Sequence, residues 1–359
     1  MKKNLLPKTR LFSFIVAAKT LSLLVTVSHA QAIEGITFSH NDWELACDNT
    51  GTCRAAGYSQ EDISDDSGSY PLDMFGSVLL TRAAGPDQTI SGQFSFRNDD
   101  DNELSSSRTV RLTIGNQEYG QIEYKDTPVA LTKKQVQALL DAAKTDQIIS
   151  FIDGDKQGII SNQGMSAVFL KMDDFQKRID TTGAIIRKGN KPETSVLQPQ
   201  PKPTLVIPKT LESDETLKND YLNKREKIMG LTQADYKENC SIDDQEEQDL
   251  DIYPLNNQQA LISRLCWRAA YNSGTAFWVV DKNLNSAKFI TSDATDYENG
   301  EIGSGQKGRG IGDCWQFETY SWNGKEFIAS GKTNTGMCKG QPGSYWDLPT
   351  LVYDVTKEQ

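Results

Sequence analysis

Histidine is nearly absent from this sequence of 359 residues, which contains only His29 and His40. A Ser-His-Asp or Cys-His catalytic centre uses a histidine as its base, and catalytic zinc sites commonly take histidine ligands. His29 lies in a segment that we expect to be removed, which leaves His40 alone. We expect His40 to have a structural role near the start of the first strand, so we predict no catalytic residues, no metal ligands and no cofactor.

Long apolar stretches are also scarce. Near the start, LFSFIVAA (11–18) and LSLLVTV (21–27) are separated by Lys19, whereas a membrane-spanning helix needs about 20 apolar residues in a row. The first thirty-two residues contain basic but no acidic side chains and end in small residues. This pattern predicts a signal peptide over residues 1–32, cleaved after Ala30 or Ala32. We therefore expect an exported, soluble mature chain without a membrane span.

Positive charge is in short supply. The chain has 38 Lys and Arg against 49 Asp and Glu, and loss of the signal peptide would lower the formal net charge from −11 to −16. A chain this acidic repels nucleic acid and anionic lipid surfaces. The simplest interpretation is a surface that keeps an exported protein soluble, so we expect no nucleic-acid partner.

Cysteine is limited to six residues, none of them in a C-x-x-C pair. The missing pairs disfavour a redox motif and a structural zinc site. An even number of cysteines in an exported chain predicts disulfides instead. Since short loops close at the lowest entropic cost, we expect the bonds Cys47–Cys53, Cys240–Cys266 and Cys314–Cys338.

The first two cysteines enclose the sequence Asp48-Asn49-Thr50-Gly51-Thr52. Asp, Asn and Gly readily adopt the positive φ angles that a tight turn needs. The stretch therefore predicts a hairpin loop whose two ends are joined by the Cys47–Cys53 bond.

Proline is distributed unevenly, because five of the twelve prolines fall within residues 190–209. Such a segment is typical of an extended, semi-rigid linker. The mature chain is also longer than one hydrophobic core usually supports. We therefore predict an N-terminal domain over 33–189 and a C-terminal domain over 210–359. We expect limited proteolysis to cut first between Lys191 and Lys209 and to release two folded halves.

The N-terminal domain has strand patterns interrupted and followed by helical ones. Runs of alternating or β-branched residues predict strands at 76–85, 89–96, 108–124, 147–151 and 158–160. Residues 131–143 predict a helix, since Thr132 and Gln135 have the spacing of a capping box. Residues 161–180 predict a second helix, capped by Ser161. We expect a strand meander or sandwich with two helices packed on it.

The C-terminal domain begins with two helical candidates, 212–230, which ends at a glycine, and 256–266. After Cys266 the pattern predicts strands, and Asn323-Gly324 in YSWNGKEF is a strong hairpin signal. We expect a disulfide-stapled β domain preceded by helices. The predicted fold class is thus α+β, with two β-rich domains.

One glycine-rich stretch and several acidic ones invite functional interpretations. GSGQKG (303–308) has the letters of a dinucleotide-binding motif without its strand-to-helix context, so we interpret it as a flexible glycine loop. Acidic groups at Asp65–Asp66, Asp99–Asp101, Asp173–Asp174 and 242–251 lack the spacing of a calcium loop. We interpret them as solvated acidic loops, with a calcium-stabilised module as an alternative.

Aromatic residues are dense after the fourth cysteine. Tryptophan or tyrosine beside polar groups suits recognition of a ligand or partner, whereas tryptophan beside a disulfide is commonly part of a core. Both interpretations stay open here. The candidate ligand-binding residues are Trp267, Tyr271, Trp315, Tyr320 and Trp322.

The stretch HNDWELACDNTGTCRAAGY (40–58) resembles a family of uncharacterised exported proteins of Gram-negative bacteria, known only as a domain of unknown function. The resemblance continues in residues 164–189, 266–274 and 307–327, and we take DWxxxCDNTxxCRAAGY and GRGIGDC as its markers. Members commonly have G-D-C-G where this chain has Gly312-Asp313-Cys314-Trp315. The resemblance implies a periplasmic location and no established activity.

These observations favour a periplasmic protein that binds an envelope component or a periplasmic protein partner without catalysis. The aromatic C-terminal domain is the expected contact surface. The alternative is a carboxylate-based hydrolase acting on cell-wall glycan, which needs two carboxyl groups facing each other across a cleft. A single sequence does not reveal such a pair.

Overall fold

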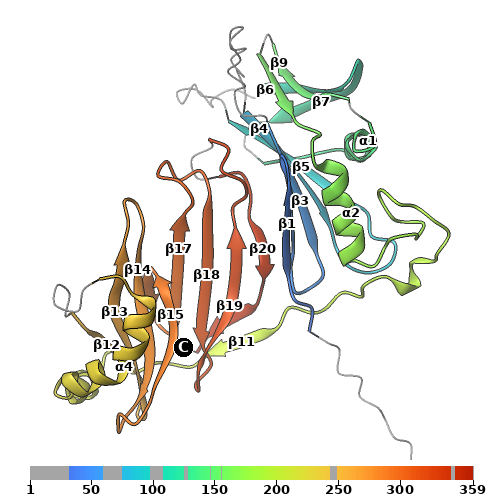
Figure 1. Ribbon diagram of the computed structural model, residues 1–359. Coiled ribbons are helices and arrows are strands. Elements are labelled where there is room, and N and C mark those ends of the chain that lie inside the picture. Colours follow the sequence, from blue (N-terminus) through green and yellow to red (C-terminus); the bar gives the residue numbers. More distant parts are fainter. Residues whose placement is uncertain are drawn as a thin grey trace, which may run out of the picture. The chain divides into compact units, whose positions relative to one another are not determined.

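The computed structural model (Figure 1) describes residues 32–59, 75–97, 108–124, 128–145, 147–154, 156–242, 249–340 and 344–358. Ile33–Gln359 forms one compact unit. The predicted signal peptide lies outside the described residues, apart from Ala32. Within the described part, no helix has the length and apolar character needed to cross a membrane.

The N-terminal half is built on an antiparallel sheet in which the strands as far as β5 follow one another as a meander. Side chains alternate between its two faces, so Trp43, Leu45, Val78 and Leu80 share one buried core. The strand order is β1 (Ile36–His40), β2 (Trp43–Cys47), β3 (Cys53–Tyr58), β4 (Phe75–Arg82), β5 (Ser91–Arg97) and β8 (Val129–Ala130).

A second sheet and two helices complete this core. Phe94 of β5 stacks on Phe151 of β9, with ring centroids 3.7 Å apart, and α2 packs across β1, β2 and β3. The sheet order is β10 (Lys156–Ile160), β9 (Ile149–Asp153), β6 (Arg108–Ile114) and β7 (Gln117–Tyr124), and the helices are α1 (Lys133–Ala142) and α2 (Met165–Phe175).

The two helices test the capping predictions separately. At α1 the Thr132 and Gln135 side chains form the predicted capping box. The prediction that Ser161 caps the second helix is wrong, because α2 begins at Met165 behind Gly164, which has a φ of 93°. A Cβ at Gly164 would lie 1.8 Å from the carbonyl oxygen of His40, so this close approach requires a glycine.

The proline-rich segment has fixed contacts with the N-terminal half. Its short 3-10 helix, Glu193–Ser195, is held by the buried ion pair of Arg178 with Glu193, at 2.5 Å. Leu197 accepts a hydrogen bond from the Gly85 N–H. Further along, β11 (Thr204–Ile207) pairs in parallel with β21 (Asp354–Lys357). The division into two domains stays a prediction.

The C-terminal half starts with α3 (Glu215–Leu222) and α4 (Arg225–Asn239), and α4 packs on β14 and β15. Its first sheet is β12 (Asp251–Asn256), β13 (Gln259–Arg268), β14 (Ser273–Asp281) and β15 (Ala287–Ala294). Its second sheet is β16 (Asp296–Glu298), β17 (Glu301–Lys307), β18 (Trp315–Trp322), β19 (Phe327–Asn334) and β20 (Leu348–Leu351).

Two helix predictions in this half need correction. Residues 256–266 are largely strand β13, not a helix, because the Gln258 N–H bonds the Asn256 side chain in a turn and the strand is buried between its neighbours. Residues 212–230 form two helices rather than one ending at a glycine. The second helix runs through Gly230, where open space surrounds the missing Cβ and an interior glycine costs only about 1 kcal/mol.

In this β-rich α+β fold each cysteine is bonded to its neighbour along the sequence, as predicted. The bonds are Cys47–Cys53, Cys240–Cys266 and Cys314–Cys338. Cys47 and Cys53 face each other across the β2–β3 hairpin, whose turn contains Gly51 with a φ of 87°. The predicted Asn323-Gly324 hairpin joins β18 to β19.

Candidate functional site

The glycine-rich stretch 303–308 lies mostly on strand β17, so the prediction of a flexible loop is wrong. The glycines are there because neighbouring side chains occupy the space of a Cβ. At Gly305 a Cβ would lie 3.1 Å and 3.3 Å from two ring carbons of Phe317, and at Gly308 it would lie 2.5 Å from the Cys314 sulfur. The glycines therefore let a ring and a disulfide lie against the strand.

Trp315 and Phe317 form an aromatic pair on the neighbouring strand, β18. Their ring centroids are 5.7 Å apart and their planes differ by 7°. The pair is held in place, since the Trp315 Nε1–H donates to the Gly312 carbonyl at 3.0 Å and the Lys307 ammonium lies 5.1 Å from the Trp315 ring centroid. Phe317 is nevertheless 38% exposed, so part of the pair faces outward.

These rings line a cavity of about 690 Å³. Its walls come from β1, from β17 to β19, and from the Cys314–Cys338 disulfide. Besides Phe38, Trp315 and Phe317, the lining contributed by the described residues consists of polar side chains, glycines and the disulfide. The volume is within the range of small-molecule sites, about 300–1,000 Å³. We call this space the aromatic cavity.

Two carboxylates line the aromatic cavity, and both are engaged. Glu318 pairs with Lys332 at 2.6 Å and accepts a hydrogen bond from Tyr320 at 3.0 Å. Burial, followed by the charge of Glu318, raises the pKa of Tyr320 to about 12. Glu44 accepts hydrogen bonds from the Tyr58 hydroxyl at 2.5 Å and the Met337 N–H at 2.7 Å. Burial raises the pKa of Glu44, although both hydrogen bonds act to lower it.

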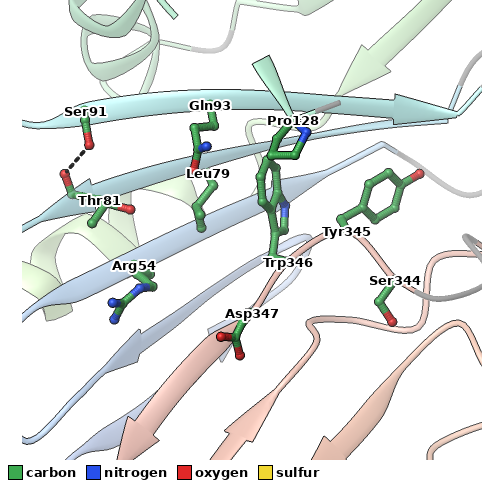
Figure 2. A pocket seen from close by; sticks show the side chains of 10 residues that line it. All are labelled: Arg54, Leu79, Thr81, Ser91, Gln93, Pro128, Ser344, Tyr345, Trp346 and Asp347. Atoms are coloured by element: carbon green, nitrogen blue, oxygen red, sulfur yellow. Dashed lines mark hydrogen bonds between the residues drawn. The ribbon is translucent and has the colours of Figure 1, made fainter. Parts of the chain in front are cut away.

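A second cavity, of about 530 Å³, surrounds Trp346 and is shown in Figure 2. The Trp346 ring points toward Pro128 beside Leu79 (Figure 2), and its Nε1–H donates to the Ser77 hydroxyl at 2.6 Å. Only 7% of Trp346 is exposed. We call this space the Trp346 cavity. Its indole is buried and bonded, so the aromatic surface left for a ligand is that of the half-buried Tyr345, which also lines this cavity.

The predicted aromatic candidates occupy different environments. Trp322 is 1% exposed within the core of the C-terminal half. Trp267 is half-buried and donates to Asp293 at 3.0 Å. Tyr271 is 49% exposed, and its hydroxyl donates to the Gly308 carbonyl. Of the five candidates, Trp315 alone is among the described residues lining the aromatic cavity.

Phe38, Phe317 and Lys307 are among the contributors to the aromatic cavity that were not predicted. Phe317 carried a signal, because Trp315 and Phe317 are two apart on a strand and so share a face. Lys307 becomes their neighbour only through strand pairing, since it lies opposite Trp315 in the register of β17 and β18.

The remaining predicted features do not assemble a catalytic or metal site among the described residues. His40 is exposed at the end of β1. Asp173 is buried and pairs with Arg82 at 2.7 Å. Asp65–Asp66, Asp99–Asp101 and residues 243–248 lie outside the described residues. One described group with metal-ligand spacing is Asp313 with Cys314 and Cys338, but the two sulfurs are bonded to each other.

Comparisons with known proteins place the chain among uncharacterised ones. Residues 37–353 match the family described as "Protein of unknown function (DUF1176)". The uncharacterized protein YpfG of Escherichia coli (strain K12) is 27% identical over 221 residues, which are 54% of this chain and 58% of that relative. The match thus spans little more than half of either protein. No solved structure matches the chain.

Proposed function

The chain belongs to this family of proteins of unknown function, and we propose that it is an exported protein that binds an envelope component without transforming it. Three disulfides within the described residues support export, because such bonds form and persist in oxidising compartments. In Gram-negative bacteria that compartment is the periplasm.

The observation that carries the binding proposal is the aromatic cavity. Ligand sites are concave and combine aromatic side chains with a few polar groups. Phe317 is 38% exposed and lies at the cavity wall beside Trp315. An aromatic ring left open to solvent next to a cavity is available for contact with a ligand, whereas Trp322 of the same half is buried in the core.

Binding is favoured over catalysis by the state of the lining carboxylates. Glu44 and Glu318 each have protein partners, and the described lining contains no histidine. The alternative, a carboxylate-based hydrolase of cell-wall glycan, has no observation among the described residues in its favour. A periplasmic protein partner remains the second kind of ligand for the same surface.

A co-sedimentation experiment tests the proposal. The mature chain from residue 33 is mixed with purified peptidoglycan and, separately, with outer-membrane vesicles, and soluble products are assayed in the same samples. We expect binding to one of the two without release of products. Phe317→Ala should weaken the binding about tenfold, since aromatic contacts contribute up to about 1.5 kcal/mol. Leu170→Ala, which removes a similarly exposed apolar side chain (39%) on α2 outside the cavity lining, is the matched control.

Two results would contradict the proposal. If the protein binds neither peptidoglycan nor outer-membrane vesicles, an envelope component is not its ligand. Release of products that a single Glu→Gln change in the cavity abolishes would make the protein an enzyme.

A further inference from the structure

We propose that the aromatic cavity is a saccharide-binding site, in which a sugar ring stacks on Phe317 and Trp315 while neighbouring amide and hydroxyl groups bond its hydroxyls. The proposal rests on the proposed function and names its ligand class. It is carried by the composition of the cavity, by the orientation of the rings and by the polar groups at their edge.

The composition of the wall separates a sugar from a lipid or an apolar peptide. Among the described residues that line the cavity there is no Leu, Ile, Val, Met or Ala. Acyl chains and the anchor residues of peptides bury aliphatic surface. A sugar instead has faces of C–H bonds, which carry small positive charges, and edges of hydroxyl groups. The C–H faces suit the negative face of an aromatic ring.

The orientation of the rings fits this kind of contact. Phe317 lies against the backbone of β17 at Gly305, where the missing Cβ leaves room for the ring. The plane of the Trp315 ring is tilted by only 7° from that of the Phe317 ring, and Trp315 is held through its Nε1–H. The two rings are therefore fixed in parallel before any ligand arrives, which lowers the entropic cost of binding.

Polar groups adjoin the two rings along the cavity wall. Thr37 and Ser39 are exposed on the facing part of β1, and Gln316 is an exposed lining residue whose side chain lies on the other face of β18 from the rings. Lys307, at the Trp315 ring, adds a positive charge. Amides and hydroxyls both donate and accept hydrogen bonds, so they can match the mixed donors and acceptors of sugar hydroxyls.

An extended peptide is the competing ligand. β1 is the edge strand of its sheet and lines the cavity, and edge strands can accept a further strand. The missing aliphatic pockets weigh against it, because strand addition takes its specificity from pockets for alternate side chains.

Titration of the mature protein with defined probes tests the proposal. The probes are a peptide-free oligosaccharide of N-acetylglucosamine, a neutral glucose oligosaccharide, a muropeptide and a β-forming peptide, measured by calorimetry and tryptophan fluorescence. We expect at least one peptide-free oligosaccharide to bind. Whether the muropeptide or a free oligosaccharide binds more tightly then distinguishes cell-wall glycan from other sugar sources.

Variants locate the site. Phe317→Ala should weaken binding about tenfold, and Leu170→Ala, at a similarly exposed position outside the cavity, should leave it unchanged. Gly305→Ala adds only a methyl group, which must displace the Phe317 ring by a few tenths of an ångström, so we expect a smaller loss, about two- to fivefold. Thermal unfolding of each variant shows whether it is folded. If Phe317→Ala does not fold, Gly305→Ala still tests the site.

The outcomes separate this inference from the proposed function. Envelope binding that depends on Phe317, with no affinity for any peptide-free oligosaccharide, overturns the saccharide and leaves the binding function standing. Binding of the peptide probe alone has the same meaning. Oligosaccharide binding that both Phe317→Ala and Gly305→Ala leave unchanged overturns the site. If neither envelope fractions nor probes bind, both proposals fail.

Discussion

Trp346 and Trp315 each line a cavity formed by described residues, and the two side chains differ in how they are exposed. At the Trp346 cavity the indole is 7% exposed and bonded to Ser77, so the side chain fills space between β-strands of the N-terminal sheet and the C-terminal segment. At the aromatic cavity Trp315 and Phe317 form part of an open wall. The comparison teaches that an aromatic residue near a cavity indicates a binding site only when a ring remains accessible.

The coarsest test of this comparison is to cut the chain. If the predicted domain division is right, limited proteolysis cuts first between Lys191 and Lys209. Because Trp346 bonds Ser77 and Glu44 bonds Met337 across the two halves, we expect the fragments to co-elute in gel filtration and to separate only in denaturant. Co-elution would contradict the predicted release of two independent halves. A first cut elsewhere, detected by mass spectrometry, would contradict the predicted linker.

Trp346→Ala should cause the largest loss of stability among single substitutions at the two cavities. Truncating a buried tryptophan costs about 3–5 kcal/mol of the free energy of unfolding, and it also leaves the Ser77 hydroxyl without this partner. Trp315→Ala, at a half-buried position, should cost less than about 2 kcal/mol. Urea unfolding of both variants measures the difference, and equal losses would remove the distinction between the two cavities.

The disulfide at the aromatic cavity, Cys314–Cys338, should contribute more to the free energy of unfolding than the hairpin disulfide, Cys47–Cys53. Cys314–Cys338 spans 24 residues and Cys47–Cys53 spans six, so loop closure predicts about 3–4 kcal/mol for the first and about 2–3 kcal/mol for the second. Replacing each pair by serine and measuring unfolding in urea checks the order. Loss of Cys314–Cys338 should also weaken ligand binding, because its sulfurs belong to the cavity wall. A larger cost for Cys47–Cys53 would contradict the closure argument.

Substitution of Glu44 should have the smallest effect on the free energy of unfolding, and this effect should depend on pH. Burial raises the pKa of its carboxyl, so the folded state binds this proton more tightly than the unfolded state. The Glu44 contribution to stability is therefore greatest below the unfolded pKa and declines as the pH rises toward the folded pKa. Glu44→Gln removes this titration.

The stability of Glu44→Gln relative to the wild type should consequently improve as the pH rises from about 4 to about 7. Urea unfolding at a series of pH values measures the relative stability, and Glu123→Gln, at an exposed position, is the control. A difference between Glu44→Gln and the wild type that stays constant with pH would show that Glu44 titrates alike in the folded and unfolded states.

Predictions based on neighbouring residues were confirmed most often. The Thr132–Gln135 capping box and the Asn323-Gly324 hairpin depend on contacts within a few residues. The predictions for Ser161 and for residues 256–266 failed where distant backbone decides the structure. The carbonyl of His40 sets the start of α2, and the neighbours β12 and β14 hold residues 259–268 as a strand.

In the candidate site, too, local sequence predicted some residues and contacts between distant segments decided the others. Trp315 was recognised as a candidate because tryptophan near polar residues suits binding, and Phe317, two residues further on, shares its strand face. Lys307 enters the site only through the register of β17 and β18. The five candidates could not be ranked from sequence, because exposure separates Trp322 in the core from Tyr271 at the surface.

By itself, the sequence determined the β-rich α+β class, the local pairing of the cysteines, and the scarcity of histidine. Each depends on composition or on spacing along the chain. Tertiary structure alone decided that glycines 303–308 make room for Phe317 and the Cys314–Cys338 disulfide, and that Trp346 is buried while Phe317 is exposed. The physical reason is that burial and cavity walls arise from strands far apart in the chain, such as β1 and β18, whose proximity no local pattern encodes.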